Sequence, residues 1–84
     1  MLSSQRAKEA KIPNVFLIKD LAYLTRYSIH TIKYYLKIGL IKETSRSPET
    51  HYRYFDDSTV EMLKRIHVLR KEGKSIRQIK DELL

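Results

Sequence analysis

The chain has 84 residues, no cysteine, and 17 Lys and Arg against 10 Asp and Glu, which gives a net charge of +7. This length allows one small domain, and the missing cysteines exclude disulfides and thiolate metal sites. Because the sequence has neither a signal peptide nor the roughly 20 apolar residues that span a bilayer, we expect a cytoplasmic protein without a membrane partner. The positive charge favours a nucleic acid over an anionic membrane or an acidic protein.

Residues 1–14 carry three cations against one acid, show no sustained apolar period, and include Pro13. We predict that they form a flexible basic arm, and that the folded domain comprises residues 15–84. Such an arm is either a solvated leader or a segment that follows a DNA groove.

Two short helices are predicted next. Leu17, Leu21 and Leu24 recur at helical spacing, which predicts a first helix that ends near Thr25. Ser28 is a suitable N-cap for a second helix that stops at Gly39. The tight turn between them is typical of a helix-turn-helix, in which the second helix enters the major groove of DNA.

The second helix has two different faces. Ile29, Ile32 and Leu36 lie on one side of a helical wheel and are expected to be buried, with Tyr35 packed near the edge of the core. The opposite side is polar, aromatic and basic, and no acid occurs between residues 21 and 42. A helix with this charge on one side is suited to a polyanion. The face consists of His30, Thr31, Lys33, Tyr34, Lys37 and Ile38.

The rest of the chain predicts a hairpin and two more helices. Residues 41–44 and 51–55 are the expected strands, and Arg46, Ser47 and Pro48 are the expected tip. Tyr52 and Tyr54 would share one face of the second strand, and at least one is expected to be structural. Asp56 then caps a helix that runs to about residue 71. The break at residues 72–75 starts a last helix with an apolar face of Ile76, Ile79 and Leu83.

Several of these motifs together resemble the DNA-binding part of the mercury-resistance-regulator (MerR) family of bacterial transcription factors, over residues 18–84. The stretch IKDLAYLT at 18–25 is similar to the family's first helix, and SIHTIKYY at 28–35 is similar to its recognition helix with a basic-Tyr-Tyr signature. Gly39-Leu40-Ile41 matches the following turn. HYRYF at 51–55 stands where the family has a Gly-Tyr-Arg-x-Tyr wing strand, and residues 69–80 resemble its closing helix-loop-helix.

This resemblance implies a mainly α fold, a winged helix-turn-helix of four helices with a small two-stranded antiparallel wing. It implies a second wing at the loop around Gly73 and Lys74. We therefore expect sequence-specific binding to double-stranded DNA in transcriptional control, with the protein associated with the nucleoid. The predicted DNA-binding residues are Lys19, His30, Thr31, Lys33, Tyr34, Lys37, Arg46, Tyr52, Arg53 and Lys74.

The sequence departs from the family at three points. Arg26 stands where the family usually has a turn glycine, and Leu36 stands where it usually has an acid. The long helix that normally forms an antiparallel coiled-coil dimer, and the sensor domain after it, are missing. The chain is therefore either a minimal member or one cut at the domain edge. We expect a monomer alone, with pairing on DNA or through a missing C-terminal segment.

Two other DNA-related roles remain open, a recombination directionality factor and a chromosome-anchoring or architectural protein. A third alternative is a module whose basic face binds an acidic protein. An enzyme is not expected, because His30, His51 and His67 have neither metal-ligand spacing nor a matching carboxylate set, and no glycine-rich phosphate loop occurs. We expect no cofactor and no metal, since metal-sensing members of the family use cysteines beyond the end of this chain.

Overall fold

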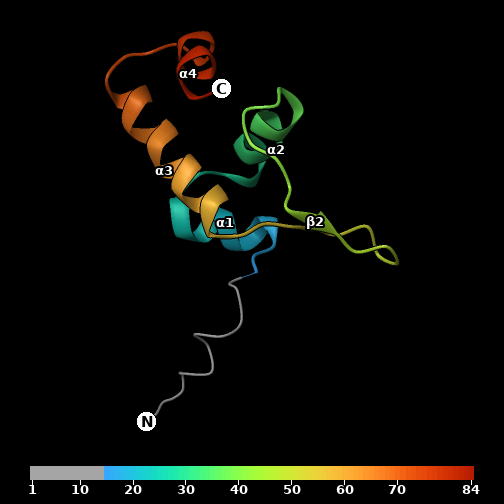
Figure 1. The fold of residues 1–84 in the computed structure, drawn as a ribbon. Coiled ribbons are helices and arrows are strands. Elements are labelled where there is room, and N and C mark those ends of the chain that lie inside the picture. The colour runs from blue at the N-terminus through green and yellow to red at the C-terminus, as the bar shows by residue number, and fades with distance from the viewer. Residues whose placement is uncertain (1–14) are drawn as a thin grey trace.

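The computed structural model describes residues 15–84 (Figure 1). The predicted basic arm at residues 1–14 lies outside the described residues. Four helices surround one core, and a two-stranded hairpin extends away from them (Figure 1). In chain order the elements are α1 (Ile18–Thr25), α2 (Ile29–Lys37), β2 (Ser45–Arg46), β3 (Arg53–Tyr54), α3 (Asp57–Lys71) and α4 (Ile76–Leu83). The predicted fold class is confirmed.

Each of the first two helices starts with a local side-chain cap. The Asp20 carboxylate accepts a hydrogen bond of 2.8 Å from the backbone N–H of Leu17 at the start of α1. The hydroxyl of Ser28 accepts a bond of 3.0 Å from the N–H of Thr31 at the start of α2. These bonds satisfy N–H groups that have no partner inside a helix, so the sequence sets where both helices begin.

The turn between α1 and α2 requires a left-handed residue, and Arg26 takes this conformation with φ of +68°. Its N–H donates to the carbonyl of Ala22 at 2.9 Å and closes α1. The same feature recurs in the hairpin, where His51 has φ of +63°. Both residues stand at positions where the resemblance leads us to expect glycine.

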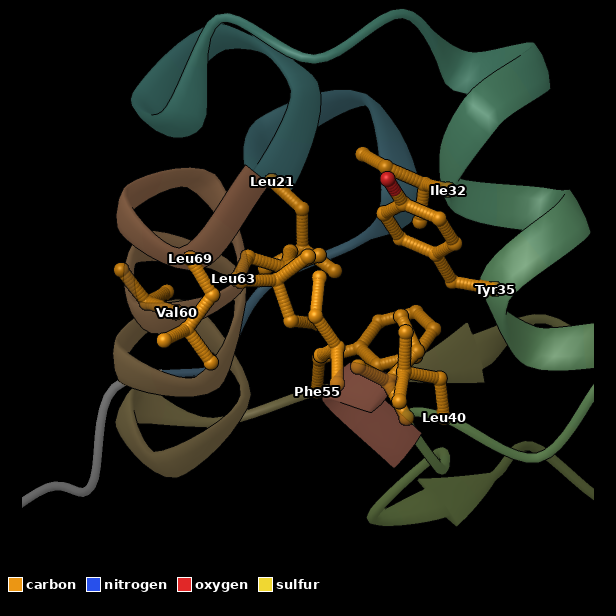
Figure 2. Close-up of a cluster of buried hydrophobic side chains, with 11 residues drawn as sticks. Leu21, Ile32, Tyr35, Leu40, Phe55, Val60, Leu63 and Leu69 are labelled. Carbon is orange, nitrogen blue, oxygen red and sulfur yellow. The ribbon is translucent and has the colours of Figure 1, made fainter. Parts of the chain in front are cut away.

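The core is built where the four helices and the hairpin meet. Figure 2 shows α1, α2 and α3 contributing side chains to one cluster. Leu40 and Phe55, which lie in the segments between these elements, belong to the same cluster. Fully buried members from the helices are Leu21, Ile32, Leu63, Ile66 and Ile79. Phe55 is also fixed by backbone, because its N–H and carbonyl both bond to Phe16 at 2.8 Å. This bridge joins the start of the described chain to the end of the hairpin.

The hairpin lies further along the chain than the sequence suggested. Ser45 pairs with Tyr54 and Arg46 with Arg53 in antiparallel register. The predicted first strand at residues 41–44 is wrong, because Ile41 is buried in the core and its N–H bonds the carbonyl of Tyr35 at the end of α2. Ladder hydrogen bonding starts only at Thr44, whose N–H donates to the Tyr54 carbonyl at 2.7 Å.

The tip and the second strand also begin later in the chain than predicted. Arg46 belongs to β2 and not to the tip, which starts at Ser47 with a bond from its N–H to the Tyr52 carbonyl. The second strand is shorter than residues 51–55, because the left-handed His51 turns the chain before the ladder begins. Tyr52 is exposed and precedes the strand, whereas Tyr54 is half-buried within it.

The two C-terminal helices follow the predicted boundaries. Asp56 accepts a hydrogen bond of 3.0 Å from the N–H of Ser58, and Ser75 accepts one of 3.1 Å from the N–H of Gln78. Gly73, with φ of +89°, makes the turn between α3 and α4. No helix within residues 15–84 is long and apolar enough to span a bilayer.

The left-handed turn generates a stability prediction. A non-glycine residue in this conformation costs on the order of 1 kcal/mol, so Arg26→Gly should raise the free energy of unfolding by about that amount in a denaturant titration. Arg26→Ala keeps the strain while removing the long side chain, and should give no such gain. Equal effects of the two substitutions would show that the side chain of Arg26, and not its backbone, determines the difference.

Candidate nucleic-acid interface

Helix α2 presents the two faces that the sequence predicted, with two exceptions. Ile32 is completely buried and Tyr35 is 4% exposed, whereas Tyr34 is 47% exposed. His30, Lys33 and Lys37 are also exposed. The first is Ile29, which we expected in the core but which is 40% exposed. The second is Ile38, which we expected on the outward face but which is partly buried and packs against the core.

Thr31 has a structural role in addition to its place on this face. Its N–H donates to the Ser28 hydroxyl, and that hydroxyl donates to the Thr31 side chain at 3.0 Å. Thr31 is half-buried. Its side chain therefore helps to cap α2.

Aromatic packing holds α2 against α3. The ring of Tyr27, in the turn before α2, makes edge contacts with Tyr35 at 5.5 Å and with His67 of α3 at 5.8 Å between centroids. Burial of the Tyr27 hydroxyl raises its pKa above the usual range of a tyrosine. The helix that carries the predicted reading residues is thus fixed from behind by a small aromatic cluster.

A basic groove lies between α2 and the hairpin. It is open, has a volume of about 850 Å³, and is floored by apolar side chains including Leu36 and Ile41. Its charged lining residues come from the recognition helix, the following loop and both strands: Lys33, Lys37, Lys42, Glu43, Arg46 and Arg53. Five cations and one carboxylate are therefore collected around one concave surface. We call this surface the basic groove.

The carboxylate of Glu43 joins the two arginines of the hairpin. Arg46 donates from Nε to Oε2 at 3.0 Å and from Nη2 to Oε1 at 2.8 Å. Arg53 places its Nε 3.1 Å from the same Oε1. The hydrogen bond from Arg46 holds the pKa of Glu43 below its usual range.

A second hollow, of about 420 Å³, shares Lys33, Arg46 and Arg53 with the basic groove and is also lined by α1. Lys19 of α1 lines it together with Lys33, Arg46, Tyr52 and Arg53. Six of the predicted residues thus line the basic groove or this adjoining hollow, since Lys37 lines the first. His30, Thr31 and Tyr34 line neither hollow but lie on α2 with Lys33 and Lys37.

Lys74 is placed apart from the other predicted residues. It lies in the loop between α3 and α4, and its ammonium group is 3.1 Å from Oε1 of Glu82. Lys74 is not among the described residues that line the basic groove or the adjoining hollow. Arg70 donates to its carbonyl at 3.2 Å, which ties this loop to α3.

Sequence reasoning missed two residues of the basic groove. Lys42 and Glu43 line it but are not among the residues predicted to bind DNA. The spacing of Glu43 and Arg46, three residues apart, was a visible local signal. The contact with Arg53 was not visible, because it depends on the register of the hairpin.

Metal binding receives no support from the described residues. No group of three or more His, Cys, Asp or Glu side chains within residues 15–84 is arranged to hold a metal ion. The chemistry that the surface does offer is anion binding by lysine and arginine next to a polar helix face.

A helix-turn-helix followed by a two-stranded wing and two closing helices defines a winged helix-turn-helix domain. Residues 16–84 match the family described as MerR HTH family regulatory protein. The chain therefore belongs to the MerR family. No curated protein matches it in sequence.

Two solved structures illustrate the similarity. A transcriptional regulator of the MerR family from Bacillus cereus superimposes with a TM-score of 0.78 at 21% identity, over 83% of this chain and 52% of the other. HiNmlR, a MerR family regulator lacking the sensor domain and solved bound to promoter DNA, gives 0.72 at 25% identity, over 81% and 51%. The chain thus spans about half the length of the regulators it matches.

Proposed function

We propose that this chain binds double-stranded DNA with sequence specificity and acts as a transcriptional regulator of the MerR type. The observation that carries the proposal is the basic groove, in which two lysines of α2, Lys33 and Lys37, and the two arginines of the hairpin line one concave surface. Family membership and the promoter DNA bound by HiNmlR support it. The role is non-enzymatic, and it places the protein with the nucleoid in the cytoplasm.

The residues have two kinds of role in this proposal. His30, Thr31, Lys33, Tyr34 and Lys37 enter the major groove, where lysine reads guanine and threonine or tyrosine contacts a thymine methyl or a phosphate. Arg46, Tyr52 and Arg53 bind the phosphate backbone from the first wing, with Lys19 beside them. Lys74 does so from the second wing, once it leaves Glu82.

The proposal predicts a strong dependence of binding on salt. If the chain makes six or more phosphate contacts, its affinity for a selected duplex should fall about a thousandfold when the salt concentration rises from about 50 to 200 mM. Fluorescence anisotropy with a duplex obtained by in vitro selection measures this. A loss of less than tenfold would mean that the contacts are not made, and would favour a module for an acidic protein partner. Mapping of bound chromosomal sites then separates a promoter regulator from an architectural or recombination role.

Substitutions should separate reading from anchoring. Lys33→Ala or Tyr34→Ala should change the preference among sequences, by about 1–3 kcal/mol at a contacted base pair. Arg53→Ala should weaken binding to all sequences similarly and reduce the salt slope by about one. Arg53→Lys is the matched control, because it keeps the charge and should keep the slope. Sequence-blind losses for all of these changes would show that α2 only positions the domain.

We further propose that the chain is a monomer in free solution and pairs on DNA at adjacent sites, or through a further C-terminal segment. On α4 the apolar side chains Ile76, Ile79 and Leu83 pack into or against the core, which leaves little of that helix for a partner. Sedimentation equilibrium at micromolar concentration should give a mass near the 10.0 kDa of the chain. A mass of twice that value would reveal a dimer surface.

A further inference from the structure

The two arginines of the hairpin are placed where they should repel each other. Arg46 and Arg53 are direct partners in the antiparallel register, and like charges at directly opposed positions destabilise a strand pair. Glu43 removes this repulsion, because its carboxylate contacts both guanidinium groups at 2.8 to 3.1 Å. An anion between the two arginines therefore offsets the repulsion within the hairpin.

The contact has the geometry of phosphate recognition. Arg46 uses two N–H groups on the two carboxylate oxygens, and this fork is the arrangement with which arginine binds either a carboxylate or a phosphate. Oε1 is shared with Arg53. Glu43 thus occupies the position relative to both arginines that a backbone phosphate would take.

The surroundings favour an exchangeable anion. The side chain of Glu43 is 31% exposed, and those of Arg46 and Arg53 are 43% and 42% exposed. Among the described residues that line the basic groove, Glu43 is the one acid, facing Lys33, Lys37 and Lys42 as well as the arginines. Ion pairs this exposed are weak, so a polyanion that also binds the lysines can displace the carboxylate.

We propose that Glu43 is a positioning residue that stands in for a DNA phosphate in the free protein and gives up both arginines to the phosphate backbone when DNA binds. This inference rests on the proposed DNA-binding function. Before binding, the carboxylate holds the guanidinium groups side by side and lowers the charge of the groove. On binding, the displaced carboxylate stays close to the phosphates and opposes association with any sequence.

The first test is the variant Glu43→Gln, which keeps an acceptor for the arginines but removes the charge. Two exposed ion pairs no longer have to be broken, so binding to a random-sequence duplex at about 50 mM salt should tighten roughly three- to tenfold. The salt slope should become steeper by about one, so the advantage should shrink about three- to fourfold between 50 and 200 mM. Fluorescence anisotropy on the wild type and the variant measures both quantities.

Two controls isolate the ion-pair cluster. Glu49→Gln makes the same charge change at an exposed position of the same hairpin, outside the residues that line the basic groove, and should have less than half the effect. In an Arg46→Gln, Arg53→Gln background, Glu43→Gln should lose most of its effect. Equal effects of the two glutamate variants, or an unchanged effect without the arginines, would overturn the proposal.

The remaining outcomes distinguish a failure of the proposed exchange at Glu43 from a failure of the proposed DNA-binding function. If the wild type binds DNA with a steep salt dependence but Glu43→Gln binds equally or more weakly, the carboxylate supports the arginines in the complex, and only the exchange is wrong. If neither protein binds DNA, the proposed function is wrong and the exchange with it. A thermal melt checks that each variant is folded.

A second measurement uses the wild-type chain and does not depend on a variant. The carboxyl carbon of Glu43 is followed by NMR across an acid titration, with and without a random-sequence duplex. The arginines keep the pKa of Glu43 low in the free protein, and release next to phosphates should raise it in the complex. A pKa that stays low on DNA would show that Glu43 keeps both arginines, which contradicts the proposal.

Discussion

The position of the recognition helix depends on the burial of Ile32 and Tyr35 against the rest of the core. A helix of nine residues is not stable alone in water, so α2 is held by the packing of this apolar side against α1 and the shared core. The contacts of Tyr27 with Tyr35 and His67 add a lateral constraint. The outward position of Lys33 and Tyr34 therefore follows from side chains of the same helix that lie in the core.

The same core also sets the distance between α2 and the wing. Leu40 and Ile41 are buried directly after the helix, and Phe55 is buried directly after β3, where it is bonded to Phe16. The hairpin is therefore anchored at both ends. Its arginines lie on the side of α2 that carries Lys33 and Lys37. The wing and the helix therefore line one concave surface together.

Electrostatics and stability oppose each other on this surface. A site for a polyanion needs its cations close together, and the folded chain has to tolerate them before any polyanion arrives. Here one carboxylate relieves the closest pair, and the other cations remain exposed to solvent. Arg26 and His51 show a related compromise in the backbone, since both hold left-handed turns that glycine would accept at lower cost.

The sequence by itself determined the helices and the character of the recognition face. Ser28, Asp56 and Ser75 cap helices through bonds to residues two or three positions later, and the apolar periods are equally local, so both can be read along the chain. Only the tertiary structure decided the exposure of Ile29, the burial of Ile41 and the register that places Arg46 opposite Arg53. These features depend on where distant segments meet, because a strand has no cap to mark its start and a short hairpin takes its register from the packing at its ends. The meeting of Glu43 with both arginines follows from that register, and so it could be seen only once the chain was folded.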